Sequence, residues 1–392
     1  MLSKNLILHL TLIEGVTPSI IKKLIKSQRS DVNASDLYHL SVSDWIHYFG
    51  INEIVAAKIV AGLSDMSVLE KELNLMEQHK IKLLTIADES YPALLKEIYS
   101  PPTVLYFQSY DSQSPFVLSL SKDNERNNAK CIAIVGSRKA TDYGQQIINT
   151  IVPDLVAAGY TIVSGGAVGI DAMAHQAALQ CGGKTIAILG SGLLKPYPSS
   201  NKRLFAAIVE NGGIVASSYP LMMEGLPHHF PARNRIVTGL SQGCLVVQAA
   251  QKSGALISAH CALEQGREVF AVPGTFDDEL SAGCHEVIQQ GAKLVMNSAD
   301  ILIEFGEVVA KKEVAAVQQS LFKPATVAKQ DALVSYNSIQ QRIIAACKEP
   351  ASLEDISLKT EMPFELIQSE LFTLQLDGIL SQDFTGMWLS KL

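Results

Sequence analysis

Four short segments combine the residue types that bind phosphate groups: glycine, serine, arginine and asparagine. They are VGSRKATDYG, SGGAVGID, HHFPARNRIVTGLS and KSGALISAH. The first carries Ser137 and Arg138, the second Gly166, and the fourth Ser253 and Gly254. Backbone N–H groups at the start of a helix attract anions, and an arginine beside them adds charge-assisted hydrogen bonds. The chemistry indicated is the binding of phosphates.

The third segment adds an aromatic side chain. Phe230 precedes Pro231, which is expected to begin a helix, and Arg233, Asn234 and Arg235 follow in its first turns. Two arginines, an amide and an aromatic ring suit a sugar–phosphate chain with a base that can stack. The alternative is that Phe230 lies in the core and that the arginines pair with carboxylates.

Motifs of the common catalytic sites are missing or incomplete. Gly183–Thr185 is not part of a phosphate-binding P-loop, because Ala178 stands where that motif has its first glycine and a strand follows. Gly190–Gly192 meets the dinucleotide motif only in part, and no H-E-x-x-H segment occurs. Asp171 and His175 lie four residues apart, but a helix cap and a core histidine are the more typical roles. The sequence predicts no metal, no cofactor and no catalytic residue.

The elements that must position these segments alternate regularly. Seven apolar runs rich in β-branched residues are expected to be strands: CIAIVG, TIVSGG, KTIAILG, GIVASSYP, CLVVQAA, EVFAVPG and AKLVM. Helical patterns lie between them, near residues 142–159, 171–182, 200–211, 232–241, 254–266 and 283–290. Such alternation predicts an α/β fold with a parallel sheet covered on both faces. Ligands bind beyond the carboxyl ends of the strands in such sheets, which is where the four segments stand.

The whole chain of 392 residues is too long for one ordinary domain. The fold expected is an extended Rossmann-like parallel-sheet core flanked by an N-terminal helical module and a C-terminal winged helix. The expected boundaries are 1–80 for a helical module of the helix-hairpin-helix or SAM-like type, 81–306 for the core, 307–335 for a linker and 336–392 for the winged helix. A plain helical hairpin is the alternative for the first module.

The third helix of a winged helix normally enters the major groove of DNA. Here the corresponding stretch, Pro363 to Leu376, carries Glu365 and Glu370 and no Lys or Arg. A phosphate backbone would repel it. We therefore interpret this module as a protein-interaction surface rather than a DNA-binding one.

Charge and composition exclude several classes of protein. The net charge of −7 and the pI near 5.7 exclude a globally basic nucleic-acid binder, although a local basic site remains possible. No apolar run reaches the roughly 18 residues of a membrane span, so no membrane association is expected. The six cysteines include no C-x-x-C pair, which fits a reducing cytoplasm.

The ordered motifs resemble those of the DNA-processing protein A family (DprA, also called Smf) essentially from end to end. The resemblance is densest over residues 81–296, which contain ADESYPALLKEIYSPPTVLY, IAIVGSRKATDYG, TIVSGGAVGIDAMAHQAAL, GGKTIAILGSGLLKPYPSSN, FPARNRIVTGLS, SGALISA, EQGREVFAVPG and AGCHEVIQQGAKLV. The resemblance implies single-stranded DNA binding, protection of incoming DNA in natural transformation, loading of the RecA recombinase, a homodimer and no established catalytic reaction.

The resemblance also implies roles for individual residues. Arg138 and Lys184 match basic DNA-contacting positions of the family, and Phe230 matches its base-contacting aromatic. The other implied DNA-binding residues are Ser137, Gly166, Arg233, Asn234, Arg235, Ser253 and Gly254. The chain departs from the usual family residues at Val168, Ser218, Gln248, Ala282 and His285. Val168 and Ala282 stand where arginine is usual, so these two departures remove positive charge, and DNA affinity is expected to rest more on Arg138, Arg233 and Arg235.

Two other functions stay open. Pro273–Thr275 and the residues after it weakly resemble the signature of nucleotide-processing phosphoribohydrolases, although a second pair of glycines is missing. The departures also allow an interaction scaffold with a weakened DNA site. Release of a free base from a nucleotide would support the enzyme, and a dispensable Arg138 would support the scaffold.

Overall fold

The computed structural model describes residues 2–27, 36–110, 130–307, 336–377, 379–382 and 387–390. The chain divides into two compact units, residues 1–309 and residues 310–392, and each is described by itself. The linker expected over 307–335 lies outside the described residues except for residue 307.

The larger unit is built on a nine-stranded sheet with the order β1-β2-β6-β5-β4-β3-β7-β8-β9. Its strands are β1 (Lys82–Thr85), β2 (Val104–Gln108), β3 (Cys131–Val135), β4 (Thr161–Ser164), β5 (Thr185–Leu189), β6 (Ile214–Ser217), β7 (Gly243–Val246), β8 (Glu268–Ala271) and β9 (Lys293–Leu294). The strands β3 to β9 all run parallel to one another. The strand β2 pairs antiparallel with β6, and β1 pairs antiparallel with β2. The order reverses where β3 lies between β4 and β7, the switch point at which such sheets bind ligands.

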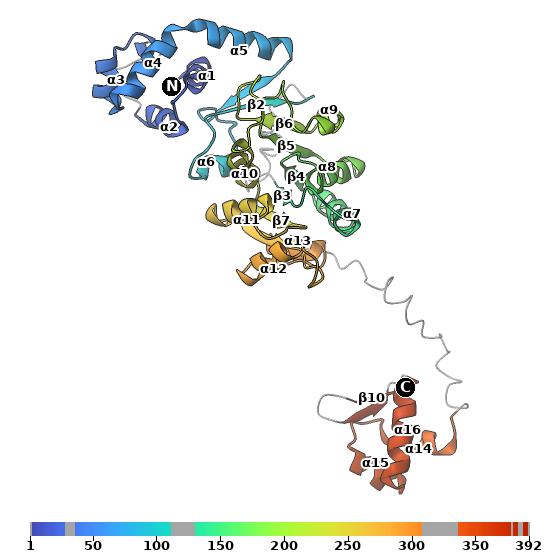
Figure 1. The fold of residues 1–392 in the computed structure, drawn as a ribbon. Coiled ribbons are helices and arrows are strands. Elements are labelled where there is room, and N and C mark those ends of the chain that lie inside the picture. Colours follow the sequence, from blue (N-terminus) through green and yellow to red (C-terminus); the bar gives the residue numbers. More distant parts are fainter. Residues whose placement is uncertain are drawn as a thin grey trace. The chain divides into compact units, whose positions relative to one another are not determined.

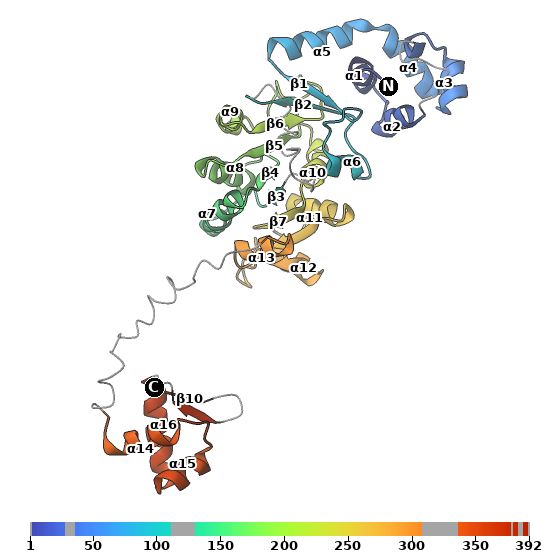
Figure 2. The same ribbon diagram turned by 180° about the vertical axis from the view of Figure 1, so that it is seen from behind.

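Helices cover both faces of the sheet, and most of them connect two of its parallel strands (Figures 1 and 2). They are α6 (Ala93–Glu97), α7 (Asp142–Ala157), α8 (Ile170–Gln180), α9 (Lys202–Glu210), α10 (His229–Gly239), α11 (Gly254–Glu264), α12 (Ala282–Gln289) and α13 (Ser298–Glu304), with a 3-10 turn at Ser199–Asn201. The side chains of alternate residues in one strand point to opposite faces of the sheet. In β3, Ile132 and Ile134 pack with the residues of α7 and α8, whereas Ala133 and Val135 pack with those of α10 and α11.

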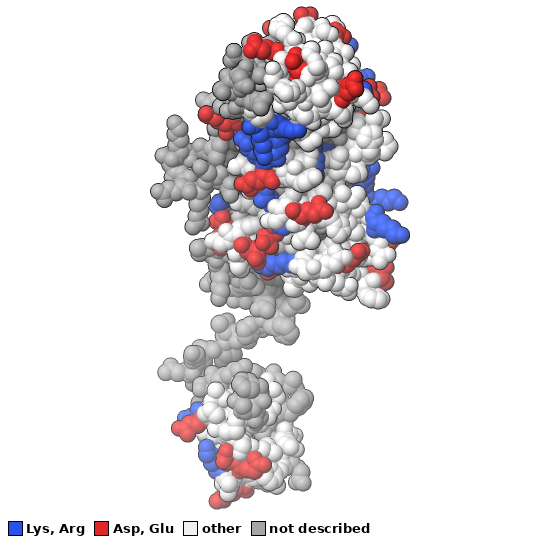
Figure 3. All heavy atoms as spheres, turned by 90° about the vertical axis from the view of Figure 1, so that its left-hand side faces the viewer, with Lys and Arg blue, Asp and Glu red and all other residues white. Residues whose placement is uncertain are grey.

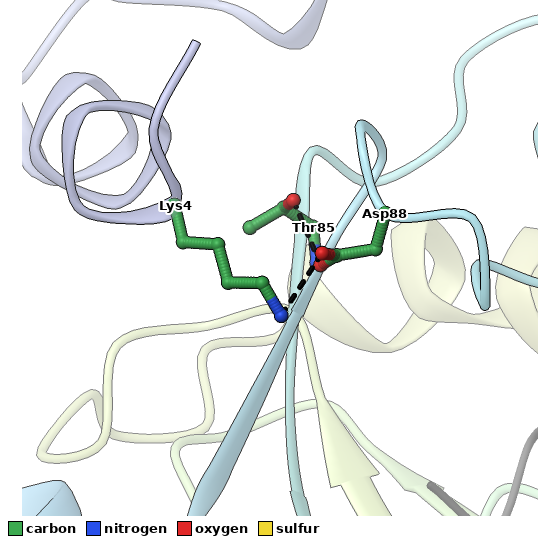
Figure 4. A network of polar contacts seen from close by, with 3 residues as sticks. All are labelled: Lys4, Thr85 and Asp88. Carbon is green, nitrogen blue, oxygen red and sulfur yellow. Dashed lines mark hydrogen bonds and ion pairs between the residues drawn. The ribbon is translucent and has the colours of Figure 1, made fainter. Parts of the chain in front are cut away.

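The N-terminal helices belong to the same compact unit as the sheet. They are α1 (Lys4–Leu12), α2 (Pro18–Lys26), α3 (Val42–Phe49), α4 (Glu53–Ser64) and α5 (Met66–Gln78), with a 3-10 turn at Asp36–Tyr38. Their apolar residues form one core with β2, β6 and α9. Asp88 joins the two parts, since it accepts hydrogen bonds from Thr85 and forms an ion pair of 2.9 Å with Lys4 of α1 (Figure 4).

The mixed α/β fold with a mostly parallel sheet is confirmed, and so are the seven strands and six helices expected between residues 131 and 296. Three details differ. The strand β1 was not expected, because KLLT is too short to show alternation. Helix α10 begins at His229 rather than at Pro231, since proline is tolerated within a first helical turn. Gly169, with φ of 82°, occupies the cap position of α8, so Asp171 lies inside the helix instead of capping it.

The smaller unit contains three helices and a strand pair in the expected order. They are α14 (Ser338–Ala346), α15 (Leu353–Thr360), α16 (Phe364–Leu376), β10 (Leu380–Gln382) and β11 (Trp388–Ser390). The strands pair antiparallel, and residues such as Ile343, Ile356 and Leu371 form the core. Its identity as a winged helix stays a prediction.

Within the described ranges, no helix is both long enough and apolar enough to cross a bilayer.

Candidate functional site

A pocket of about 650 Å³ opens at the carboxyl edge of the sheet, at the switch point between β3 and β7. Its lining comes from the loops after β3, β4, β5, β6 and β7 and from the first turns of α10 and α11. The four phosphate-type segments of the sequence therefore converge on one place. Of the predicted site residues, the lining contains Ser137, Arg138, Phe230, Arg233, Asn234, Ser253 and Gly254, and Gly166 lies between two lining residues.

One wall of the pocket is polar and open. Ser137 and the exposed Arg138 lie in the loop between β3 and α7, and Ser253 and Gly254 begin α11. A Cβ atom added at Gly254 would meet nothing within 4 Å, and the buried hydroxyl of Ser253 has no hydrogen-bond partner. The first turn of a helix leaves backbone N–H groups without partners inside the helix. This wall can therefore donate several hydrogen bonds to an anion.

Gln248 fixes the loop that carries Arg138. The Gln248 carbonyl accepts a hydrogen bond of 2.7 Å from the Ser137 N–H. Its side-chain amide accepts from the Thr141 N–H at 3.0 Å and donates to the Thr141 hydroxyl at 2.9 Å. A glutamate could not donate the second of these bonds while ionised. The departure from the family residue at this position thus holds the start of α7 without adding a charge.

Another part of the pocket lining carries two aromatic rings. The Phe230 and Tyr197 ring centroids are 5.4 Å apart, and the Arg138 guanidinium lies 5.6 Å from the Phe230 centroid. A Cβ atom at Gly190 would approach the Phe230 ring to 2.8 Å, so the glycine lets this ring pack tightly on the chain. Phe230 is only half-buried, with part of its ring in the pocket. A cation beside an aromatic face suits a nucleotide, because the cation can bind the phosphate and the aromatic face can stack on the base.

The floor of the pocket is a buried arginine. The Arg233 guanidinium donates hydrogen bonds to the carbonyl oxygens of Gly165, which follows β4, and of Ile188, which lies near the end of β5. Burial lowers the pKa of Arg233 to about 10, and Asp171 opposes this fall, so the side chain stays charged at neutral pH. Burial raises the pKa of Asp171, whose carboxylate also accepts from the Ala167 N–H at 3.2 Å. Arg233 therefore holds the glycine loop in place from below.

The structure thus separates the residues of the FPARNR segment. Arg235 donates to the Ser100 carbonyl and ties α10 to the segment after α6, and it does not line the pocket. The Asn234 amide donates to the Gly254 carbonyl at 3.3 Å, which links α10 to the start of α11. The alternative of arginines paired with carboxylates does not describe these hydrogen bonds, since both guanidinium groups donate to backbone carbonyls.

Lys184 is placed away from the pocket. It is exposed and directly precedes β5, so it lies at the amino edge of the sheet. The five residues of β5 span about 16 Å, which is more than a lysine side chain reaches. The pocket lining lacks Lys184 accordingly.

Asp171 and His175 do not converge as metal ligands. The His175 ring contacts the Thr185 hydroxyl at 2.7 Å, and this hydroxyl donates to the Ile162 carbonyl at 2.7 Å. The hydroxyl has one hydrogen, so the histidine must donate through Nδ1. Burial lowers the pKa of His175 to about 3, so the ring is neutral at neutral pH. Within the described ranges, no three His, Cys, Asp or Glu side chains gather as metal ligands.

Sequence reasoning missed Tyr197 and Gln248 at this site. Tyr197 lies in KPYPSS, where two prolines mark a loop but nothing marks its position beside Phe230. Gln248 was noted only as a departure from the family. A signal for both was the place of their segments directly after strands β5 and β7, at the edge where ligands bind.

Charge is unevenly spread over the larger unit. Figure 3 shows this unit from the side of α6 and α11. Lys and Arg side chains form one large patch on this face, whereas Asp and Glu side chains are scattered over it. The net charge of −7 therefore coexists with locally basic surface.

Comparison with known proteins gives consistent matches. Residues 82–306 match the model of the family described as DNA recombination-mediator protein A. The chain is 32% identical to Protein Smf of Synechocystis sp. over 393 residues, which cover 95% of this chain and 94% of the relative. It is 43% identical to DNA processing protein DprA of Streptococcus pneumoniae over 229 residues, 58% of this chain and 76% of the relative. The X-ray structure of that streptococcal protein superposes with a TM-score of 0.65 at 36% identity, covering 78% of this chain and 99% of that chain.

Proposed function

Because the chain belongs to the DNA recombination-mediator protein A family, we propose that its pocket binds single-stranded DNA. In the cell the protein would protect incoming DNA in the cytoplasm and load the RecA recombinase during natural transformation and recombination. The observation that carries the proposal is the placing of Arg138 over the Phe230 ring, in the pocket that Ser253 and Gly254 at the start of α11 also line. This arrangement offers a cation, backbone donors and an aromatic face within one pocket.

The same arrangement favours a single strand over a duplex. An aromatic ring inside a pocket can receive only a base that is not already paired and stacked. Phosphate contacts and stacking carry little sequence information, so little sequence preference is expected.

Binding rather than catalysis is the activity proposed. Pro273–Thr275, the basis of the phosphoribohydrolase alternative, follow β8 and are not among the residues that line the pocket. The scaffold alternative requires that the Arg138 side chain be dispensable for binding, so the experiment below decides it as well.

The partners and the modular division belong to the proposal too. We infer a homodimer and RecA as protein partners from membership of the family. Residues 1–80 would serve as the helical module, 81–306 as the DNA-binding core, 307–335 as the linker and 336–392 as a winged-helix module for protein contacts.

Fluorescence anisotropy with labelled poly-dT and a matching duplex, titrated in salt, tests the proposal. The wild type is expected to bind poly-dT more tightly, with log affinity falling linearly with log salt. Arg138→Ala should weaken binding about 10- to 100-fold, the usual effect of a lost charge-assisted contact. Lys184→Ala is the matched control, a cation outside the pocket. Absence of binding to poly-dT would refute the proposal, and equal binding to duplex would move the site elsewhere.

A further inference from the structure

Tyr197 is an aromatic side chain that the fold does not use for its core. Half of its surface, 50%, is exposed, whereas Tyr91, Tyr106 and Tyr160 of the same unit are 4%, 0% and 2% exposed. Leaving an aromatic ring in water forfeits the stabilisation that its burial would give. The exposed ring lies in the lining of the pocket rather than on an unrelated surface.

The backbone that carries Tyr197 is firmly held. The loop after β5 pairs with the loop after β6, since Gly192 N–H donates to the Met223 carbonyl at 2.8 Å and Leu194 N–H to the Leu221 carbonyl at 3.0 Å. The Leu221 N–H donates in turn to the buried Glu72 carboxylate of α5 at 2.8 Å. A ring on such a backbone is placed in advance and loses little freedom when a ligand arrives.

The other end of the same loop is tied to the polar side of the pocket. The Asn201 amide donates to the carbonyls of Gly166 and Ala167 at 3.0 and 3.2 Å. The position of Tyr197 relative to the glycine loop is therefore fixed as well. Both ends of the segment that holds the ring depend on contacts with neighbouring loops.

Phe230 contacts both Tyr197 and Arg138. The Tyr197 and Phe230 planes are tilted by 55° with centroids 5.4 Å apart, and Arg138 lies on the Phe230 ring at 5.6 Å. A Cβ at Gly225 would lie 3.1 Å from the Phe230 ring and 3.4 Å from the Tyr197 Cβ, so the chain at Gly225 passes close to both residues. Successive flat groups along one wall are what successive bases of a flexible strand stack upon.

We propose that Tyr197 is a second base-stacking residue, which with Phe230 forms an aromatic wall that holds adjacent bases while the phosphates face Ser137, Arg138, Ser253 and Gly254. The proposal rests on the proposed function and adds the orientation of the strand to it. Bases turn toward the loops after β5 and β6, and the backbone turns toward the loop after β3 and the start of α11.

Removal of the ring is expected to weaken base contacts alone. Tyr197→Ala should bind poly-dT about 5- to 50-fold more weakly, the usual effect of losing one stacked base, with an unchanged salt slope. Tyr197→Phe keeps the ring and should bind within about two-fold of the wild type. Tyr99→Ala is the matched control, because Tyr99 is fully exposed and lies outside the pocket lining.

A strand with abasic sites separates stacking from phosphate binding. With such a strand, Tyr197→Ala should equal the wild type, because no base is left to lose its contact. A 2-aminopurine placed along the strand should be quenched on binding to the wild type and less so with Tyr197→Ala. Unchanged poly-dT affinity in Tyr197→Ala, or an equal loss with the abasic strand, would overturn the inference. A wild type that binds neither strand would overturn the proposed function itself.

Discussion

The two edges of the parallel sheet carry cations in different surroundings. At the carboxyl edge, Arg138 lines the same pocket as the start of α11 and lies over an aromatic ring. At the amino edge, Lys184 precedes β5 and Lys130 precedes β3. Lys130 forms an ion pair of 2.5 Å with Glu307 and lies 5.7 Å from the Tyr160 ring centroid.

The difference shows that topology, more than charge, decides what a cation can do here. In a parallel sheet the helices begin at the carboxyl edge and end at the amino edge, so free N–H groups gather at the first and free carbonyls at the second. A polyanion is attracted by the first set and repelled by the second. Arg138 and Lys184 have the same formal charge but meet opposite backbone dipoles.

The largest effect is expected from breaking the floor of the carboxyl edge. Arg233→Met would leave the Gly165 and Ile188 carbonyls without their donor and the buried Asp171 without its counter-charge. Removing one partner of a buried charged pair costs about 3–5 kcal/mol. Urea denaturation should show this loss in the free energy of unfolding. A near-normal midpoint would show that Arg233 does not support the loop.

Charge reversal tests the edges against each other. Arg138→Glu should weaken poly-dT binding by more than about 100-fold, because a contact is lost and a repulsion is added. Lys184→Glu should weaken it less than about 3-fold, since the length of β5 separates Lys184 from the pocket and salt screens its charge. Anisotropy at fixed salt measures both. Similar losses from the two variants would remove the distinction between the edges.

Acidification tests the buried histidine near the amino edge. The folded-state pKa of His175 is about 3, below the value of about 6.5 in the unfolded chain. The unfolded state binds the proton first, so stability falls as the pH drops below about 6.5. The expected loss between pH 7 and pH 5 is about 2 kcal/mol.

His175→Gln should remove this part of the pH dependence, because glutamine does not titrate. Urea denaturation at several pH values measures it in both proteins. A wild type and variant with parallel pH profiles would show that His175 is accessible to protons in the folded state.

The smallest effect is expected at Lys130. Its ion pair with Glu307 is half-exposed, and such pairs contribute about 0–1 kcal/mol. Lys130→Ala should lower the free energy of unfolding by less than about 1 kcal/mol and leave poly-dT binding unchanged. Thermal unfolding and anisotropy measure the two quantities. A large loss of DNA affinity would show that the amino edge attracts the strand after all.

Much of the fold could be predicted from the sequence because its signals are local. The runs CIAIV and TIAIL are apolar throughout, as a strand buried on both faces requires, and each helix between the strands has its own periodicity. The glycines and Arg138 marked the loops at the carboxyl edge because residue type is also a local signal. The antiparallel β1 gave no such signal within its four residues.

The side chains of the site were harder to predict because their roles depend on distant partners. Arg233 and Arg235 have the composition of a phosphate site, yet their partners are carbonyls at Gly165, Ile188 and Ser100. Tyr197 meets Phe230 only when the loops after β5 and β6 are paired. Residue type predicted the chemistry of the pocket, but three-dimensional packing decides which residue performs it.

The ends of the sheet affect how the protein meets other chains. An open sheet exposes unpaired backbone groups at its outermost strands, where another strand could add and cause aggregation. Here β9 has two residues, and β1 has four and packs against α1. Little backbone is left for a tenth strand at either end. A second copy of the chain would therefore have to associate through side chains rather than by continuing the sheet.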